Sequence, residues 1–163
     1  MKIGLLSDTH SFLHPRVKVL FEACDEIWHA GDFGSVAVAD EIEAWGKPLR
    51  GVYGNIDGAE LRLRFPENLW FECAGLSVFM THIGGYPNKY APRIKPLLQN
   101  NPPNMFISGH SHILKVMPDP SLGLLHINPG ACGIEGWHKV KTLIRFEIIN
   151  ARPTNLEVIE LGD

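Results

Sequence analysis

The sequence predicts an α/β sandwich in which two β-sheets face each other and helices cover the outside. The first third of the chain alternates short apolar runs with amphipathic stretches, the pattern of parallel strands joined by crossover helices. The remainder contains apolar runs separated by turns rich in proline, glycine and asparagine, which favours a mostly β second half. The length of 163 residues favours a single domain over residues 1–163.

The first half supplies strands and helices in alternation. Its strands are expected at residues 3–6, 26–30 and 49–53. A first helix is expected to begin at Pro15, because proline suits a first helical turn and apolar residues then recur at helical spacing. A second helix is expected over residues 36–45, where Gly46 and Pro48 end the pattern.

The second half supplies mainly strands. Two runs at residues 69–73 and 76–81 flank Ala74-Gly75, which indicates a hairpin. A helix is expected over residues 90–98, although Pro92 and Pro96 weaken the pattern. The other expected strands cover residues 105–108, 114–117, 124–127, 142–149 and 155–161.

Composition narrows the class of protein. The net charge of -3 and the absence of a basic block argue against nucleic acid as a partner. Three cysteines, odd in number and far apart, favour a reducing compartment and argue against a disulfide framework. No apolar run has the length of a membrane span and no signal peptide is visible, so we expect a cytoplasmic protein with no membrane partner.

Five apolar runs end in side chains that can bind metal ions. The run ends are Asp8-Thr9-His10, Gly31-Asp32, Gly54-Asn55, Thr81-His82 and Gly109-His110-Ser111-His112. Ligands of open α/β sheets bind beyond the carboxyl ends of strands, so we expect these side chains to gather at one edge. Each motif alone also fits a polar turn or a structural histidine. The His-x-His step is more specific, because it places two imidazoles on the same side of an extended segment.

The types of donor indicate the kind of metal. Seven donors are present, namely Asp8, His10, Asp32, Asn55, His82, His110 and His112. None is a thiolate, which argues against soft-metal and iron–sulfur sites. Two carboxylates, one amide oxygen and four imidazoles suit two divalent first-row ions, since a single zinc needs only three or four ligands.

These motifs resemble those of the calcineurin-like metallophosphoesterase superfamily. The match runs in order from residue 8 to residue 112, and Ile127-Asn128-Pro129-Gly130 is similar to the compact bacterial and archaeal branch. The resemblance implies a four-layer αββα sandwich with a two-metal site between the sheets. It implies a first metal held by Asp8, His10, Asp32 and His112. It implies a second held by Asp32, Asn55, His82 and His110, with manganese expected and iron, nickel, cobalt or zinc as alternatives.

The resemblance also implies an activity. It points to a phosphodiesterase that hydrolyses small phosphate esters by attack of a hydroxide bridging the two metals, with Asp32 and Asn55 acting through the metals. The sequence departs from the family pattern at two positions. Ser35 stands at the last position of the family's Gly-Asp-x-x-Asp motif, so only Asp32 of that motif can bind a metal. Ile56 replaces the usual histidine, which contacts the substrate phosphate and can protonate the leaving oxygen. An alkyl side chain cannot transfer a proton. We therefore expect activity on activated or diester substrates and weak activity on alkyl monoesters.

Other polar residues allow two interpretations each. Asp57 either orients a metal-bound water or a ligand histidine, or caps the segment 58–65, which is slightly favoured. Gly84-Gly85 either lets backbone amides approach a phosphate or is a plain turn, which is favoured. Lys89, Arg93 and Lys95 either edge the substrate entrance or form a solvated helix face. The histidines that match no motif are treated as structural or surface residues; they are His14, His29, His126 and His138.

A second function remains open. The retromer subunit of this superfamily is similar and serves mainly as an interaction module, so a non-catalytic scaffold is the alternative to the hydrolase. A scaffold is free to lose metal ligands, and none of the seven is lost in this chain. Exposed strand edges in this fold would also support a homo-oligomer.

Overall fold

The structure, a computed structural model, describes residues 1–163. In chain order its elements are β1 (Lys2–Leu6), α1 (Arg16–Leu20), β2 (Glu26–His29), α2 (Val36–Glu43), β3 (Leu49–Gly51), α3 (Ala59–Arg64), β4 (Asn68–Cys73), β5 (Leu76–Thr81), β6 (Gly85–Tyr86), β7 (Lys89–Tyr90), α4 (Lys95–Asn100), β8 (Met105–Ile107), β9 (Lys115–Asp119), β10 (Leu124–Asn128), β11 (Thr142–Ile149) and β12 (Arg152–Glu160).

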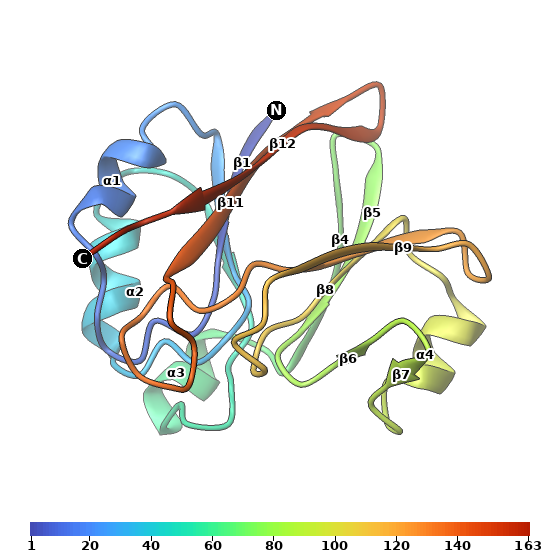
Figure 1. The fold of residues 1–163 in the computed structure, drawn as a ribbon, viewed down its shortest axis with the longest axis horizontal. Coiled ribbons are helices and arrows are strands. Elements are labelled where there is room, and N and C mark those ends of the chain that lie inside the picture. The colour runs from blue at the N-terminus through green and yellow to red at the C-terminus, as the bar shows by residue number, and fades with distance from the viewer.

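Two five-stranded mixed sheets form the centre of the molecule. The first has the order β12-β11-β1-β2-β3, and the second has the order β4-β5-β8-β10-β9. Strands β1, β2 and β3 are parallel, as are β5, β8 and β10, while β4, β9, β11 and β12 run antiparallel to the strands beside them. Helices α1 to α3 cover the first sheet, and α4 with the β6–β7 hairpin lies outside the second (Figure 1). The predicted four-layer αββα sandwich of two mixed sheets is confirmed.

The buried strand β1 shows how the layers are held together. Ile3 and Leu5 point into the core between the two sheets, where they join Trp28, Ile107 and other apolar residues. Leu6 belongs to the second core, which lies between the first sheet and its helices. A strand that packs on both faces needs a continuous apolar run, and this explains the run that begins the sequence.

The helix predicted over residues 90–98 is wrong. Lys89 and Tyr90 form the short strand β7, and the helix α4 begins only at Lys95. Pro92 disfavours the helical conformation at the residue before it, so no helix begins there. Pro96 lies in the first turn of α4, where its missing N–H costs no hydrogen bond.

The other predicted strands and helices are present, with ends that differ by a few residues. The expected strand at residues 49–53 is shortened to β3, and the last expected strand is lengthened at its start to Arg152. None of the helices combines the length and the apolar character needed to cross a membrane.

Candidate metal centre

The seven predicted donors lie just past the carboxyl ends of five parallel strands. In the first sheet, β1 is followed by Asp8 and His10, β2 by Asp32 and β3 by Asn55. Strands β5 and β8 of the second sheet are followed by the histidines His82, His110 and His112. Hydrogen bonds join the loops of the two sheets: His110 N–H donates to Asp8 Oδ2 at 3.1 Å, and His82 Nδ1–H donates to Ala30 O at 2.7 Å. The strand ends of both sheets therefore meet at one place.

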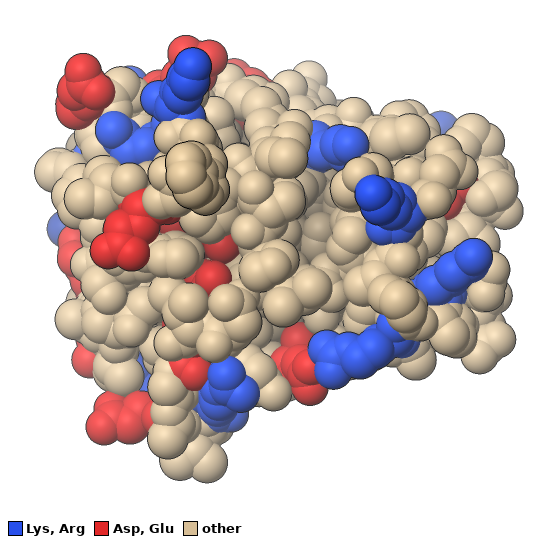
Figure 2. Space-filling view, turned by 60° about the horizontal axis from the view of Figure 1, so that its bottom comes forward, with Lys and Arg blue, Asp and Glu red and all other residues tan.

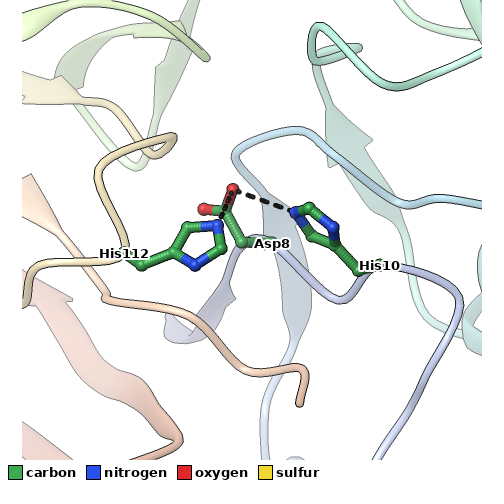
Figure 3. A group of neighbouring side chains, drawn as sticks. All are labelled: Asp8, His10 and His112. Carbon is green, nitrogen blue, oxygen red and sulfur yellow. Dashed lines mark ion pairs between the residues drawn. The ribbon is translucent and has the colours of Figure 1, made fainter. Parts of the chain in front are cut away.

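Asp8, His10 and His112 form the first group of donors (Figure 3). The Oδ1 atom of Asp8 lies 3.2 Å from His112 Nε2 and 3.9 Å from His10 Nε2. Both imidazoles turn a nitrogen toward the same carboxylate oxygen (Figure 3). Three donors that converge in this way can hold one cation.

Asp32, His82 and His110 form a second group beside the first. The Oδ2 atom of Asp32 lies 3.1 Å from His82 Nε2. The amide oxygen of Asn55 joins this group, since it lies 3.0 Å from His110 Nδ1. The second group therefore offers one carboxylate, two imidazoles and one amide oxygen.

The carboxylate of Asp32 lies between the two groups. Its Oδ2 atom is 3.4 Å from His10 of the first group and 3.1 Å from His82 of the second. Its other oxygen, Oδ1, accepts a hydrogen bond from the Ile56 N–H at 3.0 Å. Asp32 is thus fixed through one oxygen and presents the other to both groups.

Three buried polar atoms in this centre have no hydrogen-bond partner. They are Asp8 Oδ1, His10 Nε2 and His82 Nε2. In two of these residues the other polar atom is satisfied: Asp8 Oδ2 accepts from the Ser7 hydroxyl at 2.7 Å, and His82 Nδ1–H donates to Ala30 O at 2.7 Å. Buried polar atoms without partners are costly and rare in native proteins. Their convergence fits cations as the missing partners.

The electrostatics of the centre favour ionised carboxylates. Burial disfavours the charged form of Asp8, but hydrogen bonding and charge from neighbouring side chains, His10 first among them, outweigh this effect and hold its pKa well below the usual range. Burial likewise opposes ionisation of Asp32, while His82 lowers its pKa. Both side chains are therefore anionic at neutral pH, as metal ligands must be.

The backbone at the centre is strained. Five of the predicted donors have positive φ angles although they are not glycine; they are Asp8 (53°), His10 (46°), Asp32 (59°), His110 (69°) and His112 (59°). The left-handed region costs a residue with a side chain about 1–2 kcal/mol. Strain of this kind clusters at functional sites, where the surrounding structure imposes it.

Two glycines permit the close approach of these loops. A side chain at position 54 would collide with the Asp32 carboxylate, and one at position 109 would collide with the Ser7 hydroxyl. Gly54 and Gly109 directly precede Asn55 and His110. The glycines therefore let adjacent strand ends come near enough for their donors to share one space.

Asp57 has a role that neither of the two interpretations anticipated. Its carboxylate accepts hydrogen bonds from the backbone N–H groups of Phe33, Gly34 and Gly54, at 3.2, 2.9 and 2.8 Å. The N-cap residue of α3 is Gly58, and no side chain caps the helix, so the favoured interpretation of Asp57 as a helix cap is wrong. Asp57 ties the loop that carries Asp32 to the loop that carries Asn55.

His138 is a residue of the centre that the sequence motifs did not reveal. Its Nε2 lies 2.7 Å from the carbonyl oxygen of Gly133, so this nitrogen carries the proton. Its Nδ1 then accepts the N–H of His112 Nδ1, at 3.2 Å. This leaves the lone pair of His112 Nε2 facing Asp8, which is the orientation a metal ligand requires. Nothing in its sequence context identifies His138, because it follows no strand.

A hollow of about 190 Å³ opens beside the second group. Its wall includes Asn55 and His82, together with Arg62 and Arg93. Arg93 forms an ion pair with Glu67 at 2.7 Å, and Arg62 donates to Asp57 O at 2.7 Å. Since Glu67 also lines the hollow and pairs with Arg93, the guanidinium of Arg62 is the positive charge of this wall that has no acidic partner.

The family model for the calcineurin-like phosphoesterase superfamily domain matches residues 1–151. The chain belongs to this superfamily. The fold and the pair of donor groups agree with that membership, since the family implies a centre with two metals and the structure contains two candidate groups.

The chain is similar to other proteins both in sequence and in fold. A phosphodiesterase of Methanocaldococcus jannaschii is 30% identical over 150 residues, which cover 81% of this chain and 84% of the relative. The structure of an archaeal phosphodiesterase is similar with a TM-score of 0.79 and 25% identity, covering 98% of this chain and 99% of that one. Vps29 of Chaetomium thermophilum has a TM-score of 0.76 at 14% identity, covering 98% and 96%, and so shares the fold.

Proposed function

We propose that this calcineurin-like phosphoesterase is a phosphodiesterase that uses two divalent cations to hydrolyse small phosphate diesters. The observation that carries the proposal is the pair of donor groups that share the Asp32 carboxylate and direct unpartnered buried atoms into one space. The relatives that are named phosphodiesterases support the choice of reaction.

In this proposal each cation has four protein ligands. Asp8, His10, Asp32 and His112 hold the first, and Asp32, Asn55, His82 and His110 hold the second. A pair of such cations, when bound, activates water and neutralises charge on the transferring phosphoryl group. Mixed nitrogen and oxygen sites accept several first-row ions according to supply, and manganese is the ion that we test first.

The protein residues determine the charge of the site. Only Asp8 and Asp32 among the seven donors are anionic, and Asn55 contributes a neutral oxygen. Two divalent cations therefore leave the loaded site positive, which favours binding of an anionic phosphate. The guanidinium group of Arg62 near the second group adds to this attraction.

The residues around Asn55 offer no proton to the leaving group. Ile56 has an alkyl side chain that is 44% exposed, and its backbone N–H is already donated to Asp32. The carboxylate of Asp57 accepts three backbone amides and faces the loops. General acid catalysis typically contributes about 100-fold or more, so esters with poor leaving groups are expected to react slowly.

The test compares an aryl diester with an aryl monoester. We expect purified protein with Mn²⁺ to hydrolyse bis(p-nitrophenyl) phosphate faster than p-nitrophenyl phosphate. Asp32→Ala is expected to abolish activity, whereas Ser35→Ala is the matched control, because the Ser35 side chain makes no capping bond to α2. A preference for the monoester would contradict the phosphodiesterase. Protein that binds no metal and is inert toward both esters would favour the scaffold.

A further inference from the structure

We infer that a second pocket beside His110 binds an ester substituent of the substrate that is a heteroaromatic ring of nucleobase size bearing an N–H donor. The inference rests on the proposed phosphodiesterase activity and identifies the class of diester. It would assign a function to the β6–β7 hairpin and to His126, which no motif explains.

The pocket lies between the outer face of the second sheet and the β6–β7 hairpin, and has a volume of about 510 Å³. Its wall includes Ile83, Tyr86, Tyr90, His110, Lys115 and His126. Small-molecule sites typically have volumes of about 300–1,000 Å³. The hollow beside Asn55 is smaller, at about 190 Å³, so the larger substituent of an unsymmetrical diester fits only here.

The pocket is continuous with the metal centre through His110. This residue lines the pocket and also belongs to the second donor group, where its Nδ1 lies 3.0 Å from Asn55 Oδ1. A phosphate held at the second group is therefore adjacent to the pocket mouth. One ester oxygen can lead directly from phosphorus into the pocket.

His126 supplies a hydrogen-bond acceptor in the pocket wall. Its side chain lies on the outer face of β10, and the residue is only 1% exposed. Its Nδ1–H donates to the carbonyl oxygen of Phe106 at 3.1 Å, which leaves a lone pair on Nε2. No protein donor reaches Nε2, and burial lowers the pKa of His126 to about 4, so the ring stays neutral. Nε2 is not one of the buried polar atoms that lack a partner, so it opens onto the pocket and can accept a hydrogen bond from a ligand N–H.

The aromatic and charged residues of the wall suit an anionic aromatic ligand. Tyr86 is exposed, and Lys115 Nζ lies 3.9 Å from the centre of its ring. Tyr90 is fixed by its hydroxyl, which donates to Asp119 at 2.7 Å. Lysines 89 and 115 both line the pocket. In Figure 2, basic side chains predominate on the right-hand half of the face, the side on which β6, β7 and α4 lie in Figure 1, and most acidic ones lie on the left-hand half.

The experiment uses two diesters with the same leaving group. In methyl p-nitrophenyl phosphate and adenosine 5′-(p-nitrophenyl phosphate), water adds to phosphorus, the P–O bond to p-nitrophenolate breaks, and a proton is released to solvent. Only the retained substituent differs. We expect kcat/KM of Mn²⁺-loaded protein to be at least about 10-fold higher for the adenosine ester, an amount typical of one well-placed aromatic contact.

A matched pair of variants assigns the difference to the pocket. Tyr86→Ala is expected to remove most of the preference for the adenosine ester and to leave the methyl ester unchanged. Trp70→Ala is the control, because Trp70 is an exposed aromatic residue of the same sheet that stacks on Phe79 and does not line the pocket. Equal kcat/KM for the two esters, with both hydrolysed, would overturn the inference and leave the proposed function intact.

Equilibrium binding tests the ligand of this pocket independently of hydrolysis. Adenosine 5′-monophosphate is expected to bind Mn²⁺-loaded protein at least about 10-fold more tightly than inorganic phosphate, and its N6,N6-dimethyl derivative is expected to lose most of that gain. Should neither ester be hydrolysed, the proposed function fails and this titration still tests the pocket. Equal binding of the nucleotide and phosphate, or of the two nucleotides, would contradict the assigned ligand.

Discussion

The Nδ1 atoms of His112 and His138 lie 3.2 Å apart, so a histidine outside every recognised motif orients one of the proposed metal ligands. The carbonyl of Gly133 fixes the proton of His138 on Nε2, and this makes His138 an acceptor toward His112. Such outer partners hold the ring of a ligand in place and increase its basicity.

The first prediction concerns His138 as a positioning residue. His138→Ala is expected to weaken binding of Mn²⁺ about 10- to 100-fold, as loss of an outer partner typically does. Isothermal titration of metal-free protein measures this, and His138→Gln, which retains an acceptor, is expected to recover part of the affinity. Lys139→Ala on the same loop is the exposed control. Unchanged Mn²⁺ affinity in His138→Ala would show that the contact has no role in metal binding.

The second prediction concerns the carboxylate of Asp57. In Asp57→Asn, one acceptor oxygen becomes an NH₂ group, which faces either the Gly34 N–H that bonds Oδ1 or the Phe33 and Gly54 N–H groups that bond Oδ2. Leaving buried donors unsatisfied costs about 1–3 kcal/mol, so the free energy of unfolding is expected to fall by that amount. Urea denaturation measures the loss. Asp40→Asn, which removes only a surface ion pair with Arg64, is expected to cost less than about 1 kcal/mol. Similar losses in the two variants would refute the role of Asp57.

The third prediction concerns the backbone of His110, whose φ is 69°. His110→Gly and His110→Ala remove the same imidazole, but only glycine adopts this conformation freely. The glycine variant is therefore expected to be more stable than the alanine variant by about 1 kcal/mol, measured without metal. Equal stability of the two would indicate that the strain at this position is relieved.

The fourth prediction concerns pH. Burial lowers the pKa of His126 from 6.5 to about 4. As pH falls, His126 of the unfolded chain binds a proton before His126 of the folded protein does. The stability that comes from neutral His126 is therefore complete above pH 6.5 and is lost as pH falls through about 4. Between pH 7 and pH 4, wild-type protein is expected to lose about 3 kcal/mol more stability than His126→Leu. Urea denaturation at both pH values checks this, and parallel losses would contradict it.

The sequence predicted the parts of the molecule that depend on local pattern. Asp8, Asp32 and His82 each follow an apolar run, and the ends of parallel strands meet at one edge of a sheet. All seven donors were found by this rule, because each lies within a few residues of the end of an apolar run. The two sheets were predictable because their apolar runs have strand length.

The parts that the sequence did not predict depend on contacts between distant segments. His138 reaches His112 from the loop before β11, 26 positions later in the chain, and no local pattern encodes that contact. Asp57 looked like a helix cap because it precedes a helix, but its carboxylate is taken by the backbone amides of Phe33 and Gly34 on a distant loop and of Gly54 on its own loop. The segment around Pro92 had apolar spacing typical of a helix, and the proline prevents it.

The central claim is that two cations share the Asp32 carboxylate. Anomalous diffraction from crystals soaked in Mn²⁺ tests this most directly. We expect two manganese peaks about 3.5–4 Å apart, with Asp32 between them, as in other two-metal hydrolase sites. A single peak, or none within bonding distance of Asp32, would contradict the account.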